Sequence, residues 1–373
     1  MARLHREDGS ALKPTGGKTQ NSPAVVAGKH FRPLRCRSFI FEGVNDDVRA
    51  QDAPELDGGV SLLGPVEIRQ LAEELGVNPT KKLGQNFVHD PNTVRKILHA
   101  ADVGPQDHVI EVGPGLGSLT LALLGAVGEV TAIEIDPLLA GRLPRTVAEH
   151  AAPVAEHAAP VAAKLHLILR DALKVTAADW AEQGLAAPTA LVANLPYNVS
   201  VPVLLHLLEQ FPTISRVLVM VQLEVADRLA AKPGSKVYGV PSVKARYFGD
   251  TFRAATIGKN VFWPAPKVDS GLVRIDRWGV GDKPAAPWAE AVASSGFAEE
   301  VVRGETFALA DAAFLQRRKT LRAALSGHFG GGQQAEDVLR AAGIDPKQRG
   351  EKLGAEDFLA LALASLARKE GEQ

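Results

Sequence analysis

The chain has 373 residues, of which 46% are apolar and 23% charged, and its formal net charge is −1. This length allows two domains or one domain with long extensions, and the near-zero charge means that any basic surface for nucleic acid must be local. The single cysteine, Cys36, excludes an intrachain disulfide and a cysteine-built metal site. No apolar run approaches the roughly 20 residues that a membrane helix needs, so we expect no membrane partner.

Residues 1–60 differ from the rest of the chain. Pro, Gly, Ser and charged residues interrupt every short apolar run, and no helix or strand period is sustained. Basic residues dominate 1–41 and acidic residues dominate 42–60. We expect a disordered N-terminal extension or a start codon assigned too early. A basic arm that touches RNA and an organelle transit peptide are open alternatives.

The pattern becomes regular at Leu62. Two helices are predicted first, over 64–76 and 91–104, the second with Asp90 or Asn92 available as its cap. Strands and helices then alternate, which predicts an α/β domain with a doubly wound, mostly parallel sheet over 61–278. The predicted strands are the apolar runs 108–113, 129–136, 164–172, 189–195 and 216–222. Ligands of such a sheet bind at the carboxyl ends of its strands.

Two local features interrupt this alternation. A helix begins at Pro137, but Pro144 should bend or end it, because proline lacks an N–H and clashes with the preceding turn. The heptapeptide EHAAPVA occurs at 149–155 and again at 156–162. Two copies of seven residues cannot build a repeat fold, so we interpret the duplication as a tolerated surface insertion.

The remainder of the chain changes character after Gln222. A helix is predicted over 223–235, and two closing strands over 250–257 and 267–277. Residues 279–304 are rich in Gly, Pro and Ala and are typical of a linker. Only helical periods follow, so we predict a small all-α domain over 279–373. Its helices should cover 307–327, 335–343 and 355–369.

Chemistry-bearing residues follow three successive strands. The loop EVGPGLGS (111–118) places Gly113, Gly115 and Gly117 where the backbone can turn tightly and approach a ligand, although its spacing is not that of a dinucleotide site. Glu134 closes the next strand, where a carboxylate can bind ribose hydroxyls or simply lie on a solvated loop. Asp171 closes the third strand and can accept a hydrogen bond from an adenine amino group or cap a helix. An adenosyl ligand fits this set.

The fourth strand ends in Asn194-Leu195-Pro196-Tyr197. An exocyclic amine on a base is a poor nucleophile because its lone pair is delocalised into the ring. The Asn194 carboxamide oxygen and a backbone carbonyl, for which we expect Leu195, can accept its two N–H bonds and so favour a pyramidal nitrogen. Pro196 fixes the turn that presents this carbonyl. Tyr197 offers a face on which an extruded base can stack, worth roughly 1–3 kcal/mol. In isolation the motif could equally be a strand-ending turn.

These residues resemble those of the bacterial small-subunit (16S) ribosomal RNA adenine N6,N6-dimethyltransferases, which depend on S-adenosylmethionine. The resemblance covers about 62–370 and leaves out 1–60 and the duplication. Eight stretches carry it in the order of the family: KKLGQNFVHD (81–90), VIEVGPGLGSLT (109–120), AIEID (132–136), RDAL (170–173), VANLPYNVSVPVLLHLL (192–208), SKVYGVPSVKARYF (235–248), FWPAPKVDSGLVR (262–274) and FLQRRKTLRAAL (314–325).

The resemblance implies a Rossmann-like methyltransferase sheet and a set of functional positions. The cofactor-binding positions it implies are Asn86, Val88, Gly113, Glu134, Asp171 and Asn194, and Gly115 joins them as part of the glycine loop. Phe262 matches a position that sandwiches the target base opposite Tyr197, with packing under the last strand as the alternative. Phe87 is expected in the core.

The implied reaction transfers methyl groups to N6 of two adjacent adenosines in the hairpin near the 3′ end of 16S rRNA, during small-subunit maturation. No metal and no covalent enzyme intermediate is needed. The implied partner is the 30S subunit or its precursor, and we expect a cytoplasmic monomer. The target base must leave its stack, so an accessible loop is a cheaper substrate than a duplex.

RNA binding must use local positive charge, because the net charge is near zero. A helix over QRRKTLRAAL would place Arg318 and Arg322 on one face, although charges on one helix are often only a solvated face. The candidate contacts are Lys81, Lys82, Lys244, Arg246, Arg317, Arg318, Lys319 and Arg322, together with Lys232 and Lys236.

Three other functions compete with this one. Methylation of 23S rRNA adenine, of the macrolide-resistance type, shares the glycine loop and the Asn-x-Pro-Tyr turn. We favour the small-subunit enzyme because QRRKTLRAAL is followed by GIDPKQRGEKLGAEDFLALA (343–362), which fits the helical domain of that branch. A non-catalytic assembly or transcription factor is disfavoured because every expected catalytic position is intact. A DNA adenine methyltransferase lacks a visible target-recognition insert.

Overall fold

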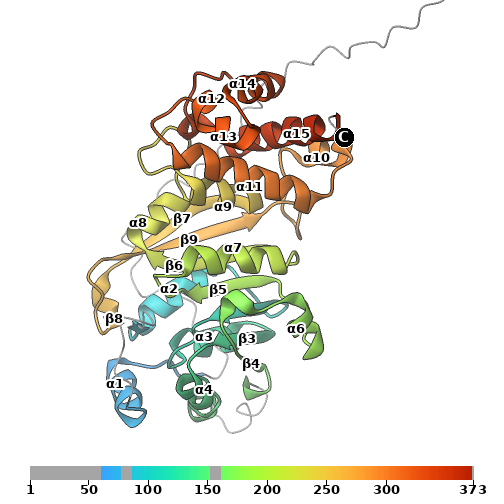
Figure 1. Cartoon of the computed structure of the whole chain (residues 1–373). Helices are drawn as coiled ribbons and strands as arrows, with labels where there is room; N and C mark the ends of the chain where they lie inside the picture. Colours follow the sequence, from blue (N-terminus) through green and yellow to red (C-terminus); the bar gives the residue numbers. More distant parts are fainter. Residues whose placement is uncertain (1–59, 77–85, 152–160, 372–373) are drawn as a thin grey trace, which may run out of the picture. The chain divides into compact units, whose positions relative to one another are not determined.

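A seven-stranded sheet forms the centre of the protein, in the strand order β4-β3-β2-β5-β6-β9-β7 (Figure 1). The computed structural model describes residues 60–76, 86–151 and 161–371, which all lie in one compact unit, Ala50–Gln373. Strands β4, β3, β2, β5 and β6 are parallel, and β9 runs antiparallel to both β6 and β7. Their bounds are β2 His108–Val112, β3 Glu129–Glu134, β4 Leu165–Leu169, β5 Ala190–Asn194, β6 Arg216–Gln222, β7 Gly249–Ile257 and β9 Ser270–Arg277. The predicted mostly parallel, doubly wound sheet is confirmed.

Alternating side chains of the strands feed two separate cores. On β6, Leu218 and Met220 belong to one core, while Val217, Val219 and Val221 belong to the other. This period of two follows from the pleat of the backbone, and both sets are apolar because helices cover both faces of the sheet. Helices α1 (Pro65–Glu74), α2 (Pro91–Ala101), α3 (Ser118–Ala126) and α4 (Pro137–His150) supply the first core, and α6 (Ala177–Glu182), α7 (Ser200–Gln210), α8 (Leu223–Leu229) and α9 (Val240–Phe248) supply the second.

A third core holds the helical region near the C-terminus. Tyr238, Val243 and Tyr247 pack with the apolar faces of α11 and α15, so α9 joins the sheet to this region (Figure 1). The all-helical pattern predicted after 307 is confirmed, whereas the domain boundary at 278 stays a prediction. The helices are α10 Ala289–Ser295, α11 Glu299–Leu315, α12 Leu321–Ala324, α13 Ser326–Phe329, α14 Gly332–Ala341 and α15 Ala355–Gly371.

The linker predicted over 279–304 is wrong for most of that range. Helix α10 and the first turns of α11 occupy it, and Trp288 is only 7% exposed. Trp288 lies 5.7 Å, ring centre to ring centre, from Tyr247, and Val302 is fully buried in the same core. Composition suggested a linker because small residues dominate the segment. The buried side chains of Trp288 and Val302 are nevertheless enough to pack it onto the third core.

The helix predicted over QRRKTLRAAL is also wrong. Helix α11 ends at Leu315, and α12 begins only at Leu321. The backbone N–H groups of Leu321 and Arg322 donate to the carbonyls of Gln348 and Pro346 at 2.7 and 3.1 Å. A distant segment thus satisfies the N–H groups that start α12, so the intervening residues form a turn instead of a continuous helix.

Pro144 does not end its helix. Helix α4 continues from Pro137 to His150. Leu139, Leu143 and Val147 are each at most 2% exposed along one side of α4. Burial of three such side chains at roughly 1.5–3 kcal/mol each outweighs the roughly 3 kcal/mol cost of an internal proline.

A small second sheet joins two distant segments of the chain, and nothing in the sequence indicated this pairing. Strand β1 (Phe87–Val88) pairs antiparallel with β8 (Phe262–Trp263), and the N–H of His89 donates to the carbonyl of Val261 at 2.9 Å. These two segments are more than 170 residues apart in the chain. Short 3₁₀ turns over Ala172–Lys174, Lys259–Val261 and Gly350–Lys352 (η1, η2 and η3) complete the described elements.

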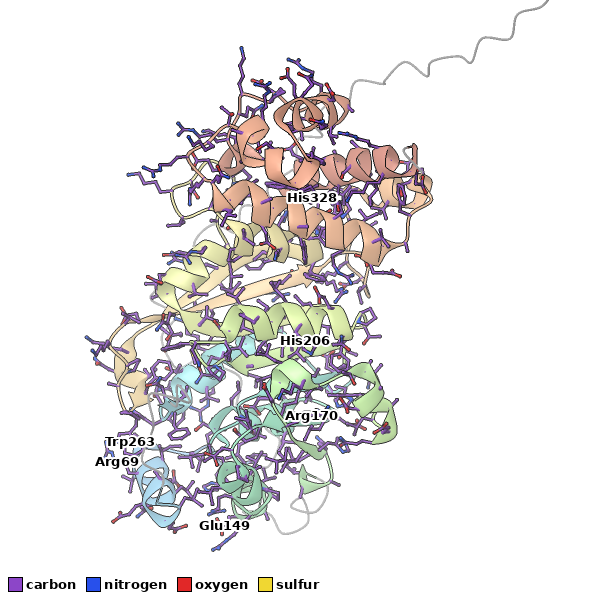
Figure 2. All side chains as sticks on the ribbon, in the orientation of Figure 1. Arg69, Glu149, Arg170, His206, Trp263 and His328 are labelled. Atoms are coloured by element: carbon purple, nitrogen blue, oxygen red, sulfur yellow. The ribbon has the colours of Figure 1, made fainter. Side chains whose placement is uncertain are left out.

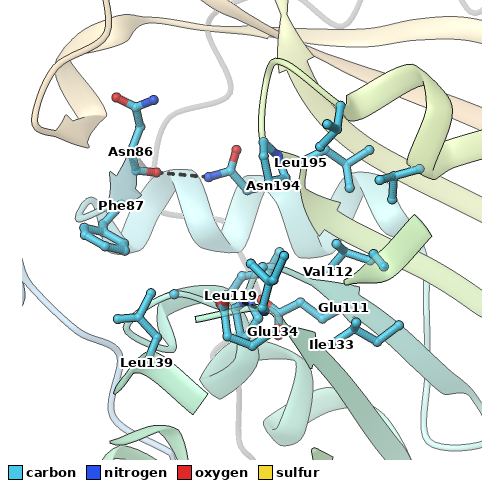
Figure 3. A pocket seen from close by; sticks show the side chains of 18 of the residues that line it. Asn86, Phe87, Glu111, Val112, Leu119, Ile133, Glu134, Leu139, Asn194 and Leu195 are labelled. Carbon is cyan, nitrogen blue, oxygen red and sulfur yellow. Dashed lines mark hydrogen bonds between the residues drawn. The ribbon is translucent and has the colours of Figure 1, made fainter. Parts of the chain in front are cut away.

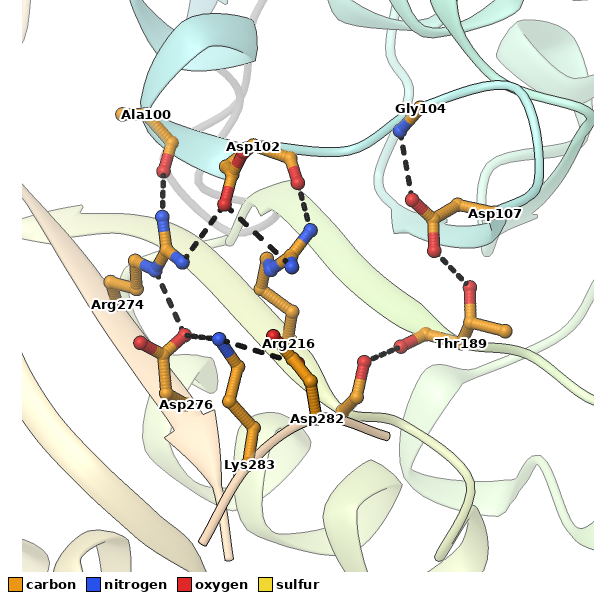
Figure 4. A network of polar contacts seen from close by, with 11 residues as sticks. Ala100, Asp102, Gly104, Asp107, Thr189, Arg216, Arg274, Asp276, Asp282 and Lys283 are labelled. Carbon is orange, nitrogen blue, oxygen red and sulfur yellow. Dashed lines mark hydrogen bonds and ion pairs between the residues drawn. The ribbon is translucent and has the colours of Figure 1, made fainter. Parts of the chain in front are cut away.

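A polar network closes the amino end of the sheet (Figure 4). The Asp102 carboxylate lies 3.3 Å from a guanidinium nitrogen of Arg274 and 3.6 Å from one of Arg216. Arg274 also donates to Asp276 at 2.9 Å and to the carbonyl of Ala100 at 3.2 Å. The network ties the end of α2 to β6 and β9, on the side away from the strand ends that carry the candidate site.

Some predictions concern residues outside the described ranges. These are the N-terminal extension 1–60, apart from Val60, the RNA-contact candidates Lys81 and Lys82, and most of the duplicated heptapeptides. Within the described ranges, no helix combines the length and the apolarity needed to cross a bilayer.

Candidate active site

The carboxyl ends of four parallel strands surround one cavity of about 240 Å³ (Figure 3). The glycine loop follows β2, Glu134 ends β3, Asp171 follows β4 and Asn194 ends β5. The structure therefore brings together every predicted cofactor-binding position and four of the five predicted catalytic positions. The predicted residues that line the cavity are Asn86, Val88, Gly113, Gly115, Glu134, Asp171, Asn194, Leu195, Pro196 and Tyr197.

The glycine loop depends on glycine for two reasons. Gly113, Gly115 and Gly117 all have positive φ, at 67°, 60° and 102°, which disfavours other residues. A Cβ on Gly115 would also lie only 2.9 Å from the ring of Phe87. Phe87 is 6% exposed and belongs to the first core, as predicted. The loop is thus pressed against β1, and its backbone forms part of the cavity wall.

Glu134 is turned toward the glycine loop. Its Oε1 accepts hydrogen bonds from the backbone N–H groups of Ile135 and Asp136 at 2.8 and 2.9 Å. Burial raises the pKa of Glu134, and hydrogen bonds from the N–H groups of Asp136, Ile135 and Gly115 oppose this rise. A buried carboxylate held by the backbone of its own turn can accept hydrogen bonds from the two hydroxyls of a ribose.

Asp171 caps a short turn and also lines the cavity. Its Oδ1 accepts the N–H of Leu173 at 3.0 Å and so caps the 3₁₀ turn η1. The same side chain lines the cavity, together with Ala172 and Leu173. The capping interpretation is confirmed, and the contact with an adenine amino group stays a prediction.

Asn194 is held in one orientation by the segment before β1. Its Nδ2 donates to the backbone carbonyl of Asn86 at 3.2 Å (Figure 3). This bond leaves the carboxamide oxygen on the opposite side of the group. Leu195 next to it is 1% exposed, and its N–H donates to the carbonyl of Met220 at 3.1 Å. The backbone of the Asn-Leu-Pro-Tyr turn is therefore fixed to β6.

Tyr197 is half-buried at the same cavity. Its hydroxyl is 2.8 Å from the hydroxyl of Ser270, which is fully buried at the start of β9. Burial raises the pKa of Tyr197, and the Ser270 hydrogen bond partly opposes the shift, so the phenol is neutral at physiological pH. The residue lines the cavity and is partly exposed, as a stacking platform requires.

Phe262 does not join this group. It is 2% exposed, belongs to the first core and is absent from the cavity wall. The pairing of Val88 with Phe262 across β1 and β8 places it there. The structure thus matches the packing alternative rather than a base sandwich opposite Tyr197. Sequence alone could not decide this, because the partner strand is far away in the chain.

The sequence analysis missed a buried acidic residue of the cavity. Glu111 lies within β2, lines the cavity and is only 1% exposed (Figure 3). The signal was present in the sequence, because Glu111 lies in the apolar run VIEVG and acidic residues are almost never fully buried unless they are paired.

Four of the residues predicted to contact RNA form ion pairs with acidic neighbours in the protein. Lys244 pairs with Asp311 at 2.9 Å, Arg317 with Glu351 at 3.0 Å and Arg322 with Glu336 at 2.9 Å. Arg246 pairs closely with Asp250 and also lies over the ring of Trp278. Arg318 and Lys319 are exposed and have no ion pair within the described ranges.

Three loops gather around Arg318 and Lys319. The N–H of Gly234 donates to the carbonyl of Glu351 at 2.7 Å, and the guanidinium of Arg317 donates to the carbonyl of Lys236 at 2.9 Å. We call the exposed cations of these loops the basic rim. Its members are Lys232, Lys236, Arg318, Lys319, Lys347, Arg349 and Lys352. The last three were missed, because only the folded chain places residues 347–352 beside the other two loops.

The cavity wall suits an adenosyl ligand with a cationic end. It offers a glycine loop whose backbone lines it, two buried carboxyls and an acidic group beside β4. In the described part of the chain, no group of three or more His, Cys, Asp and Glu side chains is placed to hold a metal ion.

Comparison with known proteins identifies a family for the chain. A profile of the family described as "Ribosomal RNA adenine dimethylase" matches residues 76–288. Ribosomal RNA small subunit methyltransferase A of Corynebacterium jeikeium is 66% identical over 317 residues, which is 82% of this chain and 97% of that protein.

The chain belongs to the ribosomal RNA adenine dimethylase family.

More distant members of the family keep the same description. The protein of Rhodococcus erythropolis, also a ribosomal RNA small subunit methyltransferase A, is 57% identical over 305 residues, covering 82% of this chain and 94% of that protein. The one from Corynebacterium diphtheriae is 62% identical over 316 residues, covering 85% of this chain and 99% of that protein.

Two solved structures share the fold. A dimethyladenosine transferase from Plasmodium falciparum superposes with a TM-score of 0.57 at 23% identity, covering 76% of this chain and 98% of that one. The 23S rRNA methyltransferase ErmE superposes with a TM-score of 0.52, also at 23% identity, covering 75% and 99%. At this identity the likeness concerns the fold alone, so it does not separate the two kinds of ribosomal substrate.

Proposed function

We propose that this protein transfers methyl groups from S-adenosylmethionine to N6 of two adjacent adenosines in the 3′-terminal hairpin of 16S rRNA. The observation that carries the proposal is the single cavity that joins the glycine loop, Glu134 and Asp171 to the Asn-Leu-Pro-Tyr turn. The small-subunit description shared by relatives at 57–66% identity supports 16S over 23S rRNA.

The ends of three neighbouring strands each contact a different part of the cofactor. Asp171 at β4 accepts from the adenine amino group, Glu134 at β3 binds the ribose hydroxyls, and the Gly113–Gly115 backbone at β2 approaches the amino-acid end. When bound, S-adenosylmethionine supplies a methyl group on a positively charged sulfur, which is the electrophile of the reaction. Asn86 and Val88 border the same end of the cavity.

The Asn-Leu-Pro-Tyr turn prepares the nucleophile. The Asn194 amide nitrogen is engaged by the carbonyl of Asn86, which presents the amide oxygen to an incoming amine. That oxygen and the Leu195 carbonyl accept the two N–H bonds of the adenine N6 and localise its lone pair. Tyr197 stacks on the extruded base, held in place by Ser270. Phe262 does not share this task in the structure described here.

The rate enhancement then comes from the positioning of the amine relative to the methyl group. The turn fixes the amine in line with the methyl group, and the amide and carbonyl oxygens stabilise the positive charge that develops on nitrogen. No side chain at the turn is a strong base. The proton leaves the product ammonium after transfer, when it is acidic.

The basic rim supplies the docking surface for the ribosomal RNA. Its seven cations lie on three loops at the junction between α8–α9 and the helical region. Phosphate contacts of this kind orient the RNA without reading its sequence. The protein works as a monomer in the cytoplasm, where the small subunit matures.

Purified 30S and 50S particles that lack the modification provide the test. With methyl-labelled S-adenosylmethionine, we expect label in 30S particles only, mapped to two adjacent adenosines near the 3′ end. Asn194→Ala should abolish methylation while 30S binding changes by no more than about twofold. Labelling of 50S particles alone would establish the 23S alternative. Unchanged 30S methylation by Asn194→Ala would remove the proposed role of the turn.

A further inference from the structure

Leu315 is the most exposed large apolar side chain in the described part of the chain. It is 85% exposed, whereas the other exposed side chains of this kind range from 37% to 62%. It is the last residue of α11 and lies on the solvent face of that helix with Ala308 and Asp311, away from the buried Thr306 and Ala313. A polar residue is the ordinary choice on such a face, so an apolar contact with a partner is a reason to look for one here.

A second exposed apolar side chain lies on the neighbouring loop. Val237 is 47% exposed, and the residues before and after it are both tied to the end of α11. The ring of Tyr238 lies 5.9 Å, centre to centre, from the ring of Phe314, and the carbonyl of Lys236 accepts a hydrogen bond from Arg317 at 2.9 Å. Val237 and the last residue of α11 are therefore held on the same part of the surface.

Positive charge surrounds these two residues, which we call the apolar pair (Leu315 and Val237). Lys236 directly precedes Val237, and Arg318 and Lys319 follow Leu315 on the turn after α11. All three cations are exposed members of the basic rim. The apolar pair is thus an apolar spot inside a cationic surface.

The acidic side chains of this surface do not cancel its charge. Asp311 pairs with Lys244 at 2.9 Å, and Glu351 pairs with Arg317 at 3.0 Å. Both of these cations lie outside the basic rim, so the pairs leave the rim intact. Asp345 is exposed on the third loop, where its carboxylate accepts a backbone N–H of its own turn at 2.9 Å. The surface therefore favours an anionic partner.

RNA combines negative charge with apolar faces. In a paired helix the faces of the bases are hidden in the stack, whereas a base in a loop, a bulge or an end can expose its face. Apolar side chains can pack on an exposed base, while cations around them contact the phosphates on either side. An apolar spot bordered by cations matches an unstacked nucleotide better than it matches a regular duplex.

We propose that Leu315 and Val237 form a subsite for one unstacked nucleotide of the ribosomal RNA. The base packs on the two apolar side chains, and the basic rim holds the phosphates that flank it. This proposal rests on the proposed function, because it takes ribosomal RNA as the partner. The subsite is distinct from the cavity at the strand ends, since neither residue lines that cavity.

Filter binding of the full-length protein to purified 30S particles, across salt concentrations, tests the subsite. Leu315→Ser combined with Val237→Ser should weaken binding at least about fivefold, because apolar contact area is lost. The slope of log affinity against log salt should stay unchanged, because no phosphate contact is removed. Unchanged affinity would overturn the proposal. A loss accompanied by a smaller slope would overturn it too, since the variant would then act through the cations.

Two control variants separate this contact from general effects of the surface. Leu315→Met combined with Val237→Ile keeps two large apolar side chains and should keep the wild-type affinity. Val301→Ser removes an apolar side chain that is 46% exposed in the first turn of the same helix, and it should also bind like wild type. A loss in Val301→Ser equal to that of the double serine variant would contradict a local subsite.

Photo-cross-linking identifies what the apolar pair contacts. A photoreactive amino acid carrying a diazirine replaces Leu315, and the complex with 30S particles is irradiated. We expect a cross-link to ribosomal RNA at a nucleotide outside its paired helices. A cross-link to a paired nucleotide, to a ribosomal protein or to a second copy of this chain would overturn the proposal, and so would none in a complex of wild-type affinity. Failure of the wild-type protein to bind 30S particles would instead refute the proposed function.

Discussion

The hydroxyls of Tyr197 and Ser270 are 2.8 Å apart, and this hydrogen bond ties the turn after β5 to the first residue of β9. Ser270 pairs with Gln222 of β6 on one side and with Ile257 of β7 on the other. It is fully buried and therefore has no freedom to follow a moving ring. The orientation of the stacking platform is thus set by the antiparallel end of the sheet.

Ser270 is expected to act as a positioning residue. Ser270→Ala and Tyr197→Phe should each lower kcat/KM for 30S particles by about three- to tenfold, the size of one lost hydrogen bond. The double variant should be no worse than either single one, because both remove the same interaction. Tyr197→Ala should cost more, since it also removes stacking worth roughly 1–3 kcal/mol. Cofactor affinity, measured by calorimetry, should stay unchanged in all four; fully additive losses would contradict the positioning role.

Gly115→Ala should weaken the cofactor site selectively. The added Cβ meets a positive φ and the ring of Phe87 at 2.9 Å, so the loop must move. A positive φ alone costs a non-glycine residue roughly 1–2 kcal/mol, so we expect at least about tenfold weaker binding of S-adenosylmethionine. Gly104→Ala is the matched control, because its Cβ meets nothing within 4 Å and its φ is not positive. Equal affinity of Gly115→Ala and wild type would show that the loop does not contact the cofactor.

The basic rim gives a salt-dependent prediction. The double reversal Arg318→Glu with Lys319→Glu should weaken binding to 30S particles at least about tenfold at low salt and reduce the slope of log affinity against log salt by about 1–2. The control reverses Arg69 and Arg145, which are exposed on α1 and α4 (Arg69 is labelled in Figure 2). Affinity and slope should be measured by filter binding across salt concentrations. A control that loses as much as the rim variant would show a general charge effect.

The Asp102 network should matter for stability and not for activity. Asp102 faces two arginines whose side chains are only 15% and 18% exposed. Asp102→Asn should lower the free energy of unfolding by about 1–3 kcal/mol, because two half-buried cations lose their shared carboxylate. The comparison is Asp250→Asn. Its ion pair with Arg246, four residues earlier in the chain, is more exposed, so the change should cost only about 0.5 kcal/mol. Urea denaturation followed by circular dichroism measures both.

Glu305 should make the helical region sensitive to acid. Its carboxylate accepts from Ser365, from His328 at 3.0 Å and from Lys369 at 2.8 Å (His328 is labelled in Figure 2). Burial opposes ionisation, but the hydrogen bonds from Lys369, Ser365 and His328 prevail and hold the pKa of Glu305 below its usual value. For a lowered carboxyl pKa, the stabilisation is present above the unfolded value of about 4.5 and is lost as the pH falls through the folded value.

The corresponding measurement compares thermal unfolding of wild type and Glu305→Gln from pH 7 down to pH 3. Wild type should be more stable at pH 7, and the difference should shrink as the pH falls below about 4.5. A difference that stays constant over this range would mean that Glu305 contributes through packing and not through its charge. Glu336→Gln, whose carboxylate lies in the exposed pairs with Arg322 and Arg340, is a suitable control.

Residues next to one another in the chain were enough to predict which groups gather around the cavity at the strand ends. Each apolar run is followed by its functional group, as with Gly113 after β2 and Glu134 at the end of β3. Parallel strands bring their carboxyl ends to one edge, so the local pattern and the sheet geometry together place these groups around one cavity. The same reasoning gave the Asn-Leu-Pro-Tyr turn, because its chemistry is contained in four consecutive residues.

Other features depend on segments that meet only in the folded chain. Phe262 is buried because β8 pairs with β1, and the turn at Arg318 exists because a loop near Pro346 satisfies the start of α12. The basic rim needs three loops that no local pattern connects. The pKa of Glu111 is raised because the folded chain removes this carboxyl from water. The sequence by itself determined the elements and the groups at their ends, since these follow from short-range periodicity. Burial and long-range pairing required the tertiary structure. They decide which side chains can reach a ligand and how readily an acidic group ionises.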